Sequence, residues 1–192
     1  MKKIRIKYNT IAGHRYLDYL SLWSCCKSNT IVALLFLVFS AYSTAAPLVL
    51  NEKTIHINLY PYLSYLEDDE KKLSIDDVIK EKFKSVEMGN AANLAFGYTG
   101  ADYWIKVELH NSTAASAWFL EVAYPLLDVV EFYTVDQKTV VSRQITGDSL
   151  LFSQRPLEHR NFIFPIELKQ GDGLNLYLKV SSQSSLKIPI TL

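Results

Sequence analysis

Six side chains between residues 104 and 160 have the chemistry to bind a polar small molecule. They are Trp104, Asp128, Asp148, Arg155, His159 and Arg160. An indole offers a flat apolar surface together with an N–H donor. Arginines carry planar donors that suit carboxylates, phosphates and sugar hydroxyls, while carboxylates accept hydrogen bonds from hydroxyl groups. These six residues are therefore the candidate ligand-binding site.

Each candidate also has a structural explanation. Trp104 points away from the apolar face of its predicted strand, where either a ligand stacks on it or a helix or loop covers it as a second small core. Arg155 and Arg160 either bind a ligand or form ion pairs that hold the loops at one end of the fold. Asp128 and Asp148 are the expected partners, although aspartates in such turns commonly cap their own backbone. The sequence leaves both alternatives open.

Motifs for catalysis are absent from the sequence. It has no glycine-rich phosphate loop, no G-x-S-x-G turn, no H-E-x-x-H and no Cys-x-x-Cys. The histidines beyond residue 45, which are His56, His110 and His159, are scattered and do not favour a metal site. We expect no enzyme activity, no cofactor and no metal; an exported hydrolase of unknown type is the remaining catalytic alternative.

Segments that alternate apolar and polar residues are predicted to position these side chains. Period-two alternation is typical of half-buried strands. The segments cover residues 55–60, 103–110, 118–124, 162–168, 174–180 and 186–192, and a further strand is expected at 129–135. Turn-forming residues separate them, as at 111–113, 146–148, 171–173 and 181–185. The pattern predicts a mainly β, antiparallel jelly-roll or β-sandwich fold.

One short helix and two prolines modify this pattern. Ser74 and Asp77 form a capping-box-like start, and the apolar residues that follow have helical spacing, so we expect a helix at about residues 75–83. The charged stretch 67–72 is expected to be an exposed turn. Pro165 and Pro189 lie within strand patterns; since proline cannot donate to a ladder, they indicate edge positions or bulges.

The first 45 residues differ from the rest of the chain in charge. They hold six lysines and arginines and one acid, whereas residues 46–192 hold 14 basic and 19 acidic residues. An apolar run at 31–39 precedes small residues up to Ala45, which predicts a signal peptide over 1–45 or an uncleaved anchor. Residues 46–192 are mildly acidic and contain no cysteine. We expect a periplasmic domain without disulfides, tethered to the inner membrane if the leader stays, with no nucleic-acid partner.

Several phrases of the sequence follow the order of one receptor family. They are Gly97-Tyr98, Tyr103-Trp-Ile-Lys-Val-Glu-Leu-His-Asn111, Tyr124-Pro-Leu-Leu-Asp-Val-Val-Glu-Phe-Tyr133, Thr146-Gly-Asp148, Arg155-Pro-Leu-Glu-His-Arg-Asn161, Leu176-Tyr-Leu-Lys-Val-Ser-Ser182 and Ile188-Pro-Ile-Thr-Leu192. Over roughly residues 50–192 the chain resembles the type-2 extracellular sensor domain of bacterial seven-transmembrane receptors with diverse intracellular signalling modules (7TMR-DISM). The resemblance implies a periplasmic jelly roll, similar to carbohydrate-binding modules, ahead of a seven-helix membrane region and an output module.

The expected function is that of a ligand-sensing domain of a signal-transduction receptor, which binds a carbohydrate-like or other small molecule. The alternative is a stand-alone carbohydrate-binding or adhesion module, because a fold alone does not determine function. The sequence stops at Leu192 without the membrane region and output module that the resemblance implies. A truncated receptor, a fragment and a soluble binding domain are the three explanations, and a membrane signalling protein or a second copy is the expected protein partner.

Overall fold

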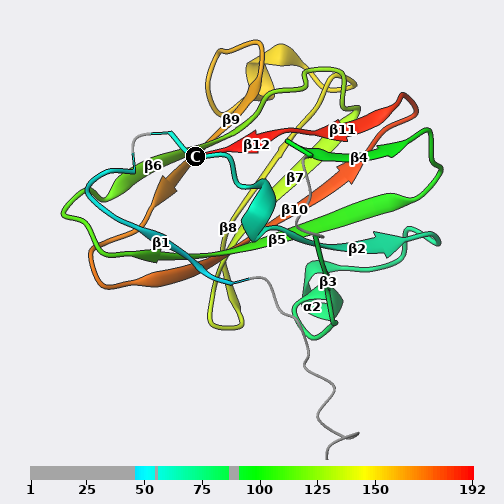
Figure 1. Ribbon diagram of the computed structural model, residues 1–192. Coiled ribbons are helices and arrows are strands. Elements are labelled where there is room, and N and C mark those ends of the chain that lie inside the picture. The colour runs from blue at the N-terminus through cyan, green and yellow to red at the C-terminus, as the bar shows by residue number, and fades with distance from the viewer. Residues whose placement is uncertain (1–45, 55, 87–90) are drawn as a thin grey trace, which may run out of the picture. The chain divides into compact units, whose positions relative to one another are not determined.

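A computed structural model describes residues 46–54, 56–86 and 91–192 of the chain. The predicted signal peptide or anchor at 1–45 lies outside the described residues. The described residues form antiparallel sheets in two packed layers with few helical turns (Figure 1). The expected mainly β, sandwich-like fold is confirmed. No helix within the described residues has both the length and the apolar character needed to span a membrane.

The larger layer is a sheet in the order β3-β2-β5-β10-β7-β8 (Figure 1). Its strands are β2 (Ser64–Asp68), β3 (Lys84–Ser85), β5 (Asp102–Asn111), β7 (Val129–Asp136), β8 (Thr139–Thr146) and β10 (Gly173–Ser181). Neighbours in this order are antiparallel. The short strand β1 (Leu48–Leu50) pairs in parallel with the end of β5, with Leu48 opposite Leu109. The long strands β5, β10 and β7 form the centre of this sheet.

The smaller layer consists of a three-stranded sheet, β12-β6-β9, and a pair, β11-β4. Its strands are β4 (Leu94–Gly97), β6 (Ala117–Val122), β9 (Phe162–Glu167), β11 (Leu186–Ile188) and β12 (Ile190–Thr191). Pro189 lies between β11 and β12, where pairing switches from β4 to β6. Pro165 lies in β9, a terminal strand of its sheet. The prediction of an edge position or bulge is confirmed for Pro165, whereas Pro189 lies between two strands and not within one.

The main core fills the space between the two layers. Alternate side chains of each strand point inward, as strand geometry requires, and the rings of Phe132 and Phe164 stack across the layers with centroids 4.7 Å apart. Both side chains are fully buried. Burial of a side chain of this size contributes about 1.5–3 kcal/mol, so the packing of facing strands holds the layers together.

Three local features differ from the sequence-based expectations. The strand expected at 55–60 is only a bridge between Asn58 and Thr191; Ile55 lies outside the described residues, and Asn58 Oδ1 accepts a hydrogen bond from the Tyr60 amide at the start of a 3-10 turn, η1 (Tyr60–Tyr62). The helix α2 covers only Ile75–Val78. The amides of residues 80 and 81 donate to carbonyls three residues earlier, which is the 3-10 pattern, so the α-helix ends there. Strands β1, β2, β3, β4 and β8 were not predicted.

Candidate functional site

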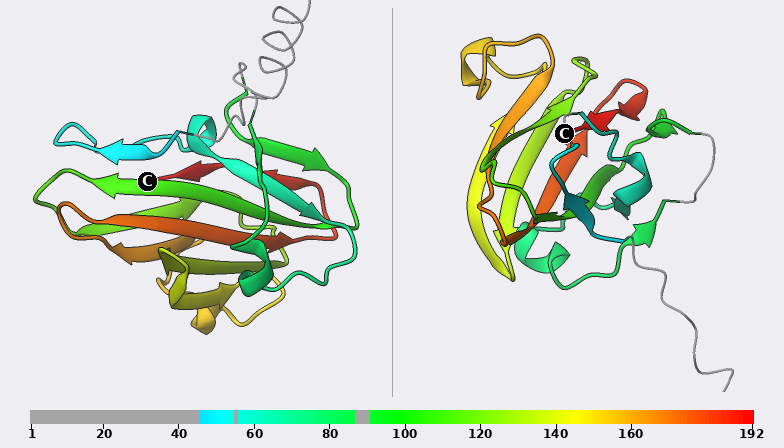
Figure 2. Two further views of the ribbon diagram at one scale, coloured as in Figure 1. Left: turned by 90° about the horizontal axis from the view of Figure 1, so that it is seen from below. Right: turned by 60° about the vertical axis from the view of Figure 1, so that its left-hand side comes forward.

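Trp104 is buried beneath α2 on the outer face of the larger sheet. Its side chain is 1% exposed and packs in a small second core with Val78, Tyr133, Val135 and Tyr177. The Trp104 and Tyr133 rings lie 5.8 Å apart. Seen from below in Figure 2, α2 lies in front of the strands of this sheet. The expectation of an exposed stacking platform is therefore corrected: of the two alternatives, the structure has the helix-covered core.

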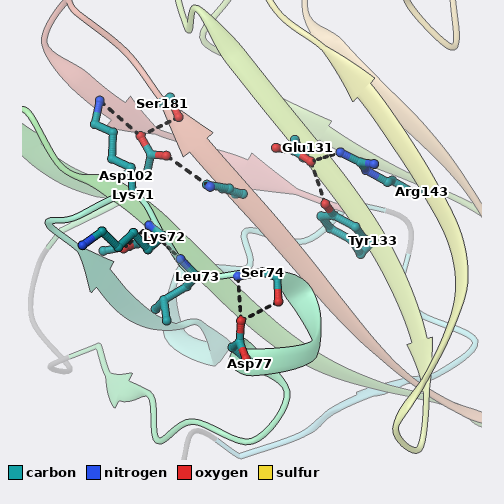
Figure 3. Close-up of polar contacts among 12 residues, drawn as sticks. Lys71, Lys72, Leu73, Ser74, Asp77, Asp102, Glu131, Tyr133, Arg143 and Ser181 are labelled. Atoms are coloured by element: carbon teal, nitrogen blue, oxygen red, sulfur yellow. Dashed lines mark hydrogen bonds and ion pairs between the residues drawn. The ribbon is translucent and has the colours of Figure 1, made fainter.

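The chain that leads into α2 is held in place by two aspartates. The carboxylate of Asp68, which is buried, accepts hydrogen bonds from the amides of Lys72 (3.1 Å) and Leu73 (3.0 Å). The carboxylate of Asp77 accepts one from the Ser74 amide (3.1 Å) and one from its hydroxyl (2.5 Å), as Figure 3 shows. The hydrogen bonds from Ser74 lower the pKa of Asp77. The expected capping box is present, and it positions α2 over Trp104.

Asp102 anchors a polar frame at the edge of this second core. Its side chain is 6% exposed and accepts a hydrogen bond from the Ser181 hydroxyl at 2.6 Å (Figure 3). The ammonium groups of Lys179 and Lys71 lie 3.3 and 3.6 Å from its oxygens. Lys179 also lies 5.5 Å from the centre of the Trp104 ring. A buried carboxylate with two cationic partners is neutralised within the protein, so we assign it to the frame of the fold.

A second polar group on the same face joins β7 to β8. Glu131 accepts hydrogen bonds from the Tyr133 hydroxyl (2.6 Å) and the Arg143 guanidinium (2.7 Å), as Figure 3 shows. Burial alone would raise the pKa of Glu131, but these two hydrogen bonds, together with the positive charges of Arg143 and Lys179, outweigh it and lower the pKa. Burial, with the hydrogen bond to Glu131, raises the pKa of Tyr133 to about 12. The group is internally satisfied, which is the usual condition of partly buried polar side chains.

The loops at one end of the sandwich are interlocked around Asp128. Its carboxylate accepts a hydrogen bond from the Gln183 amide (2.6 Å), and its carbonyl accepts one from the Ser149 amide (3.2 Å). The Asp148 amide bonds to the Leu127 carbonyl (2.8 Å), while the Asp148 side chain is exposed. Asp128 therefore joins neighbouring loops through the Gln183 amide, a structural role that differs from both the expected arginine pair and the expected cap of its own turn. Asp148 leaves its carboxylate in solvent.

Arg155 organises its own loop. Its Nη1 donates to the carbonyls of His159 (2.7 Å) and Arg160 (2.6 Å), and its guanidinium lies 4.8 Å from the ring of Phe152 and 4.8 Å from that of Phe162. The His159 ring accepts a hydrogen bond from the Asn161 amide (3.1 Å).

The ion pairs expected between these arginines and the two aspartates do not occur in the described part of the chain. The ion pairs found there join other residues, namely Lys71, Lys72, Lys106, Arg143 and Lys179 with their acidic neighbours. Backbone carbonyls have taken the place of Asp128 and Asp148 as partners of Arg155, because they lie within the same short loop. Arg160 is exposed.

A shallow groove of about 530 Å³ lies on the outer face of the smaller sheet. We call it the β6 groove; its lining residues are His56, Ala117, Trp118, Phe119, Glu121, Leu157, Ile163, Thr191 and Leu192. Strands β6, β9 and β12 supply its floor, with Phe119 opposite Pro165 and Glu121 opposite Ile163. Leu157, which is 39% exposed, comes from the loop that Arg155 organises. The volume falls within the usual range of small-molecule sites.

Aromatic and polar groups meet in the β6 groove. The Phe119 ring is 52% exposed, although Leu120 and Val122, which point inward from β6, are buried. Next to it, Glu121 Oε1 accepts a hydrogen bond from Asn161 Nδ2 at 2.6 Å, which fixes the orientation of the carboxylate. Among the described residues, Trp118 Nε1 and Asn161 Oδ1 are buried polar atoms without a hydrogen-bond partner. An apolar ring beside an oriented carboxylate suits a ligand with one apolar face and hydroxyl or amine donors.

None of the six sequence-based candidates lines the β6 groove. The missed signal was an outward phenylalanine: Phe119 occupies a position in β6 where alternation predicts a polar side chain. His56, Leu157 and Thr191 come from distant parts of the sequence, and only the fold brings them to β6. Within the described residues no group of three or more histidines, cysteines or acids could hold a metal ion.

Comparison with models of known protein families identifies the family of the chain. A family model described as 7TMR-DISM extracellular 2 matches residues 60–192, which is more than half of the chain. The chain belongs to this family. The 7TMR-DISM match begins at η1 and includes every strand from β2 onward, so the layers and the strands of the β6 groove lie within it. The protein thus carries an extracellular sensor domain of the receptor type. Comparison with curated proteins gives no match.

Proposed function

We propose that this 7TMR-DISM domain senses a carbohydrate-like small molecule that binds in the β6 groove, in the periplasm. The observation that carries the proposal is the exposed Phe119 ring beside the Glu121 carboxylate, which Asn161 orients. A sugar ring has an apolar face that stacks on aromatic rings and hydroxyl groups that donate to carboxylates. The groove supplies both contacts within one small-molecule-sized surface.

Of the six residues singled out from the sequence, two support the groove indirectly in this proposal. Arg155 and His159 hold the loop that places Leu157 at the rim of the groove. Trp104 and Asp128 act on the fold, and Asp148 and Arg160 remain solvent-facing side chains outside the groove. A ligand that binds one arrangement of the 147–161 loop more tightly would raise the population of that arrangement. A partner protein in contact with the loop would then respond to the bound ligand.

Export is part of the same proposal. Residues 1–45 would direct the chain to the periplasm as a cleaved signal peptide or hold it there as an anchor. The protein that interacts with the ligand-bound domain would be a membrane signalling protein or a second copy of this chain. The alternative function is a carbohydrate-binding or adhesion module with no signalling role. DNA downstream of the Leu192 codon separates the two, because a seven-helix segment in any frame indicates a receptor.

A thermal-shift experiment on the purified full chain tests ligand binding. The probes are glucose, galactose, N-acetylglucosamine, glucosamine and galacturonate at millimolar concentration, because a ligand that binds only the folded state raises Tm. We expect at least one sugar to raise Tm of the wild type. Phe119→Ala should abolish this rise with only a small fall in the ligand-free Tm, and Glu121→Gln should reduce the rise. Tyr98→Ala is the matched control, since Tyr98 is an exposed aromatic side chain (84%) outside the groove.

Two results would overturn the proposal. One is an unchanged Tm with all five sugars. The other is a rise in Tm that survives Phe119→Ala, which would place the ligand on another surface.

A further inference from the structure

Strand β8 is an open edge of the larger sheet. It runs for eight residues, Thr139–Thr146, and is the last strand in the order β3-β2-β5-β10-β7-β8 (Figure 1). Within the described residues only β7 pairs with it. The backbone N–H and C=O groups on its other side are therefore available to another strand. Long, exposed edge strands are templates for pairing between chains, and folded proteins usually block them.

Two other terminal strands of the described sheets, β9 and β3, carry features that oppose pairing. Strand β9 contains Pro165, which removes a donor from its ladder. Strand β3 is only two residues long and carries Lys84. Strand β8 contains neither proline nor lysine, and its one charged residue is Arg143. The β7–β8 ladder has a register shift between Thr134 and Val135, but β8 has none of the three other common protections of an edge, which are short length, proline and lysine. Its length and composition therefore favour a partner strand.

The outward side chains of β8 fit a second copy of the same strand. A two-fold axis through Arg143 pairs β8 with itself in antiparallel orientation and places Val141 opposite Ile145 of the other copy. Both side chains are exposed, at 64% and 39%. Cross-strand pairs of β-branched residues stabilise a sheet. One surface patch that pairs with itself is what a two-fold interface requires.

Charge does not oppose this pairing. The two-fold axis brings the two Arg143 residues together, but each guanidinium donates to its own Glu131 at 2.7 Å. The same guanidinium lies 5.6 Å from the centre of its own Tyr133 ring. Each arginine is therefore neutralised on its own sheet before the edges meet, and the interface brings together two neutral pairs.

We propose that the protein dimerises by antiparallel pairing of β8 with β8 of a second copy, centred on Arg143. The larger sheets of the two copies then form one continuous sheet, which is the β-strand-addition mode of recognition. The inference concerns the edge of the larger sheet and does not depend on a ligand in the β6 groove, which lies on the smaller sheet.

Sedimentation of the full chain over a range of concentrations tests the dimer. We expect a concentration-dependent dimer for the wild type, and at least a tenfold weaker one for Val141→Lys, because a lysine charge on an edge opposes pairing. Val49→Lys is the matched control, since Val49 is an exposed valine (49%) on β1; it should leave the dimer intact. A wild type that stays monomeric at every concentration, or a dimer that Val141→Lys does not weaken, overturns the proposal.

Cysteine cross-linking tests the register. In a Cys25→Ser, Cys26→Ser background, Arg143→Cys places the two thiols on directly opposed residues, with Cα atoms about 4.5–5.5 Å apart, within the reach of a disulfide. Val141→Cys places them four residues apart along the strand, or about 13 Å at ~3.3 Å per residue. We expect air oxidation to give a covalent dimer with Arg143→Cys and none with Val141→Cys. A dimer of native folding that cross-links only through Val141→Cys, or through neither, overturns this interface.

Discussion

Gly147 passes so close to Asp128 that a Cβ atom on Gly147 would lie 2.0 Å from the Asp128 carbonyl oxygen. The contact is between two backbones, so no side-chain movement can relieve it. It occurs where the chain leaves β8 and where the loops after β6, β8 and β10 are hydrogen bonded to one another. Glycine is the residue that permits such a close backbone approach.

Gly147→Ala should therefore destabilise the protein by about 3 kcal/mol or more, because the backbone has to shift in an interlocked region. Urea unfolding followed by circular dichroism measures this change. Gly100→Ala is the control: a Cβ there meets nothing within 4 Å, so its free energy of unfolding should stay within about 0.5 kcal/mol of the wild type. Equal stability of the two variants would contradict the close approach.

Trp104→Ala should cost about 3–5 kcal/mol, since the side chain is fully buried under α2 and its removal leaves a large cavity. Phe119→Ala removes a half-exposed ring and should cost less than about 1 kcal/mol. Thermal unfolding of the two variants side by side checks this contrast. A Trp104→Ala protein with the wild-type Tm would indicate that the Trp104 side chain is exposed and not part of a buried core.

Asp102→Ala should cost about 3 kcal/mol, because it leaves the partly buried Lys179 ammonium without its carboxylate. The double variant Asp102→Ala, Lys179→Ala should lose less than the sum of the single changes, with a coupling of about 0.5–3 kcal/mol. Denaturant unfolding of the wild type, the two single variants and the double variant gives the coupling free energy of this double-mutant cycle. Strict additivity would show that the two side chains do not interact.

Acid should weaken the protein in part through Glu131. The pKa of Glu131 is lower in the folded state than its ordinary value, so its contribution to stability is present above the unfolded-state pKa and disappears as pH falls through the folded-state pKa. Glu131→Gln removes this titration. We expect its free energy of unfolding to change less than that of the wild type between about pH 6 and pH 3, measured by urea unfolding. Parallel curves for the two proteins would contradict the role of Glu131.

Alkali should act through three buried tyrosines. Burial raises the pKa of Tyr103, Tyr133 and Tyr177 to about 12, with further contributions from Glu67, Glu131 and Glu108. Their folded-state pKa lies above the unfolded one, so the stability they contribute is present below about pH 10 and is lost as pH rises towards 12. Phenolate absorbance should show these groups ionising together with unfolding. Tyr177→Phe should reduce the alkaline loss; an unchanged loss would show that Tyr177 does not titrate with unfolding.

The apolar strands of the main core were predicted from the sequence. The expected segments at 103–110, 129–135, 162–168 and 174–180 correspond to β5, β7, β9 and β10, because each has one face in the main core. The capping box at Ser74 and Asp77 was also legible, because it involves contacts three residues apart. The sandwich and the family followed from these local signals.

Strand β8 could not be found in this way. Ser142 and Gln144 alternate with Val141, Arg143 and Ile145 along the strand, so neither face is uniformly apolar. The Ser142 hydroxyl is hydrogen bonded to that of Thr134 on β7 at 2.7 Å, a partner that only pairing supplies. Edge strands need less apolar surface than central ones, which makes the periodic signal weak.

The sequence by itself determined the fold class, the start of the helix, the edge position of Pro165 and the family, since each depends on patterns that a chain carries locally. Only the tertiary structure decided the fate of the candidate site. In the folded protein, Trp104 is buried under α2, and Arg155 donates hydrogen bonds to the backbone of its own loop. The fold also brings His56, Phe119 and Leu157 to one groove. The physical reason is that a side chain's exposure depends on what other segments cover it, and contacts between distant segments leave no local periodicity.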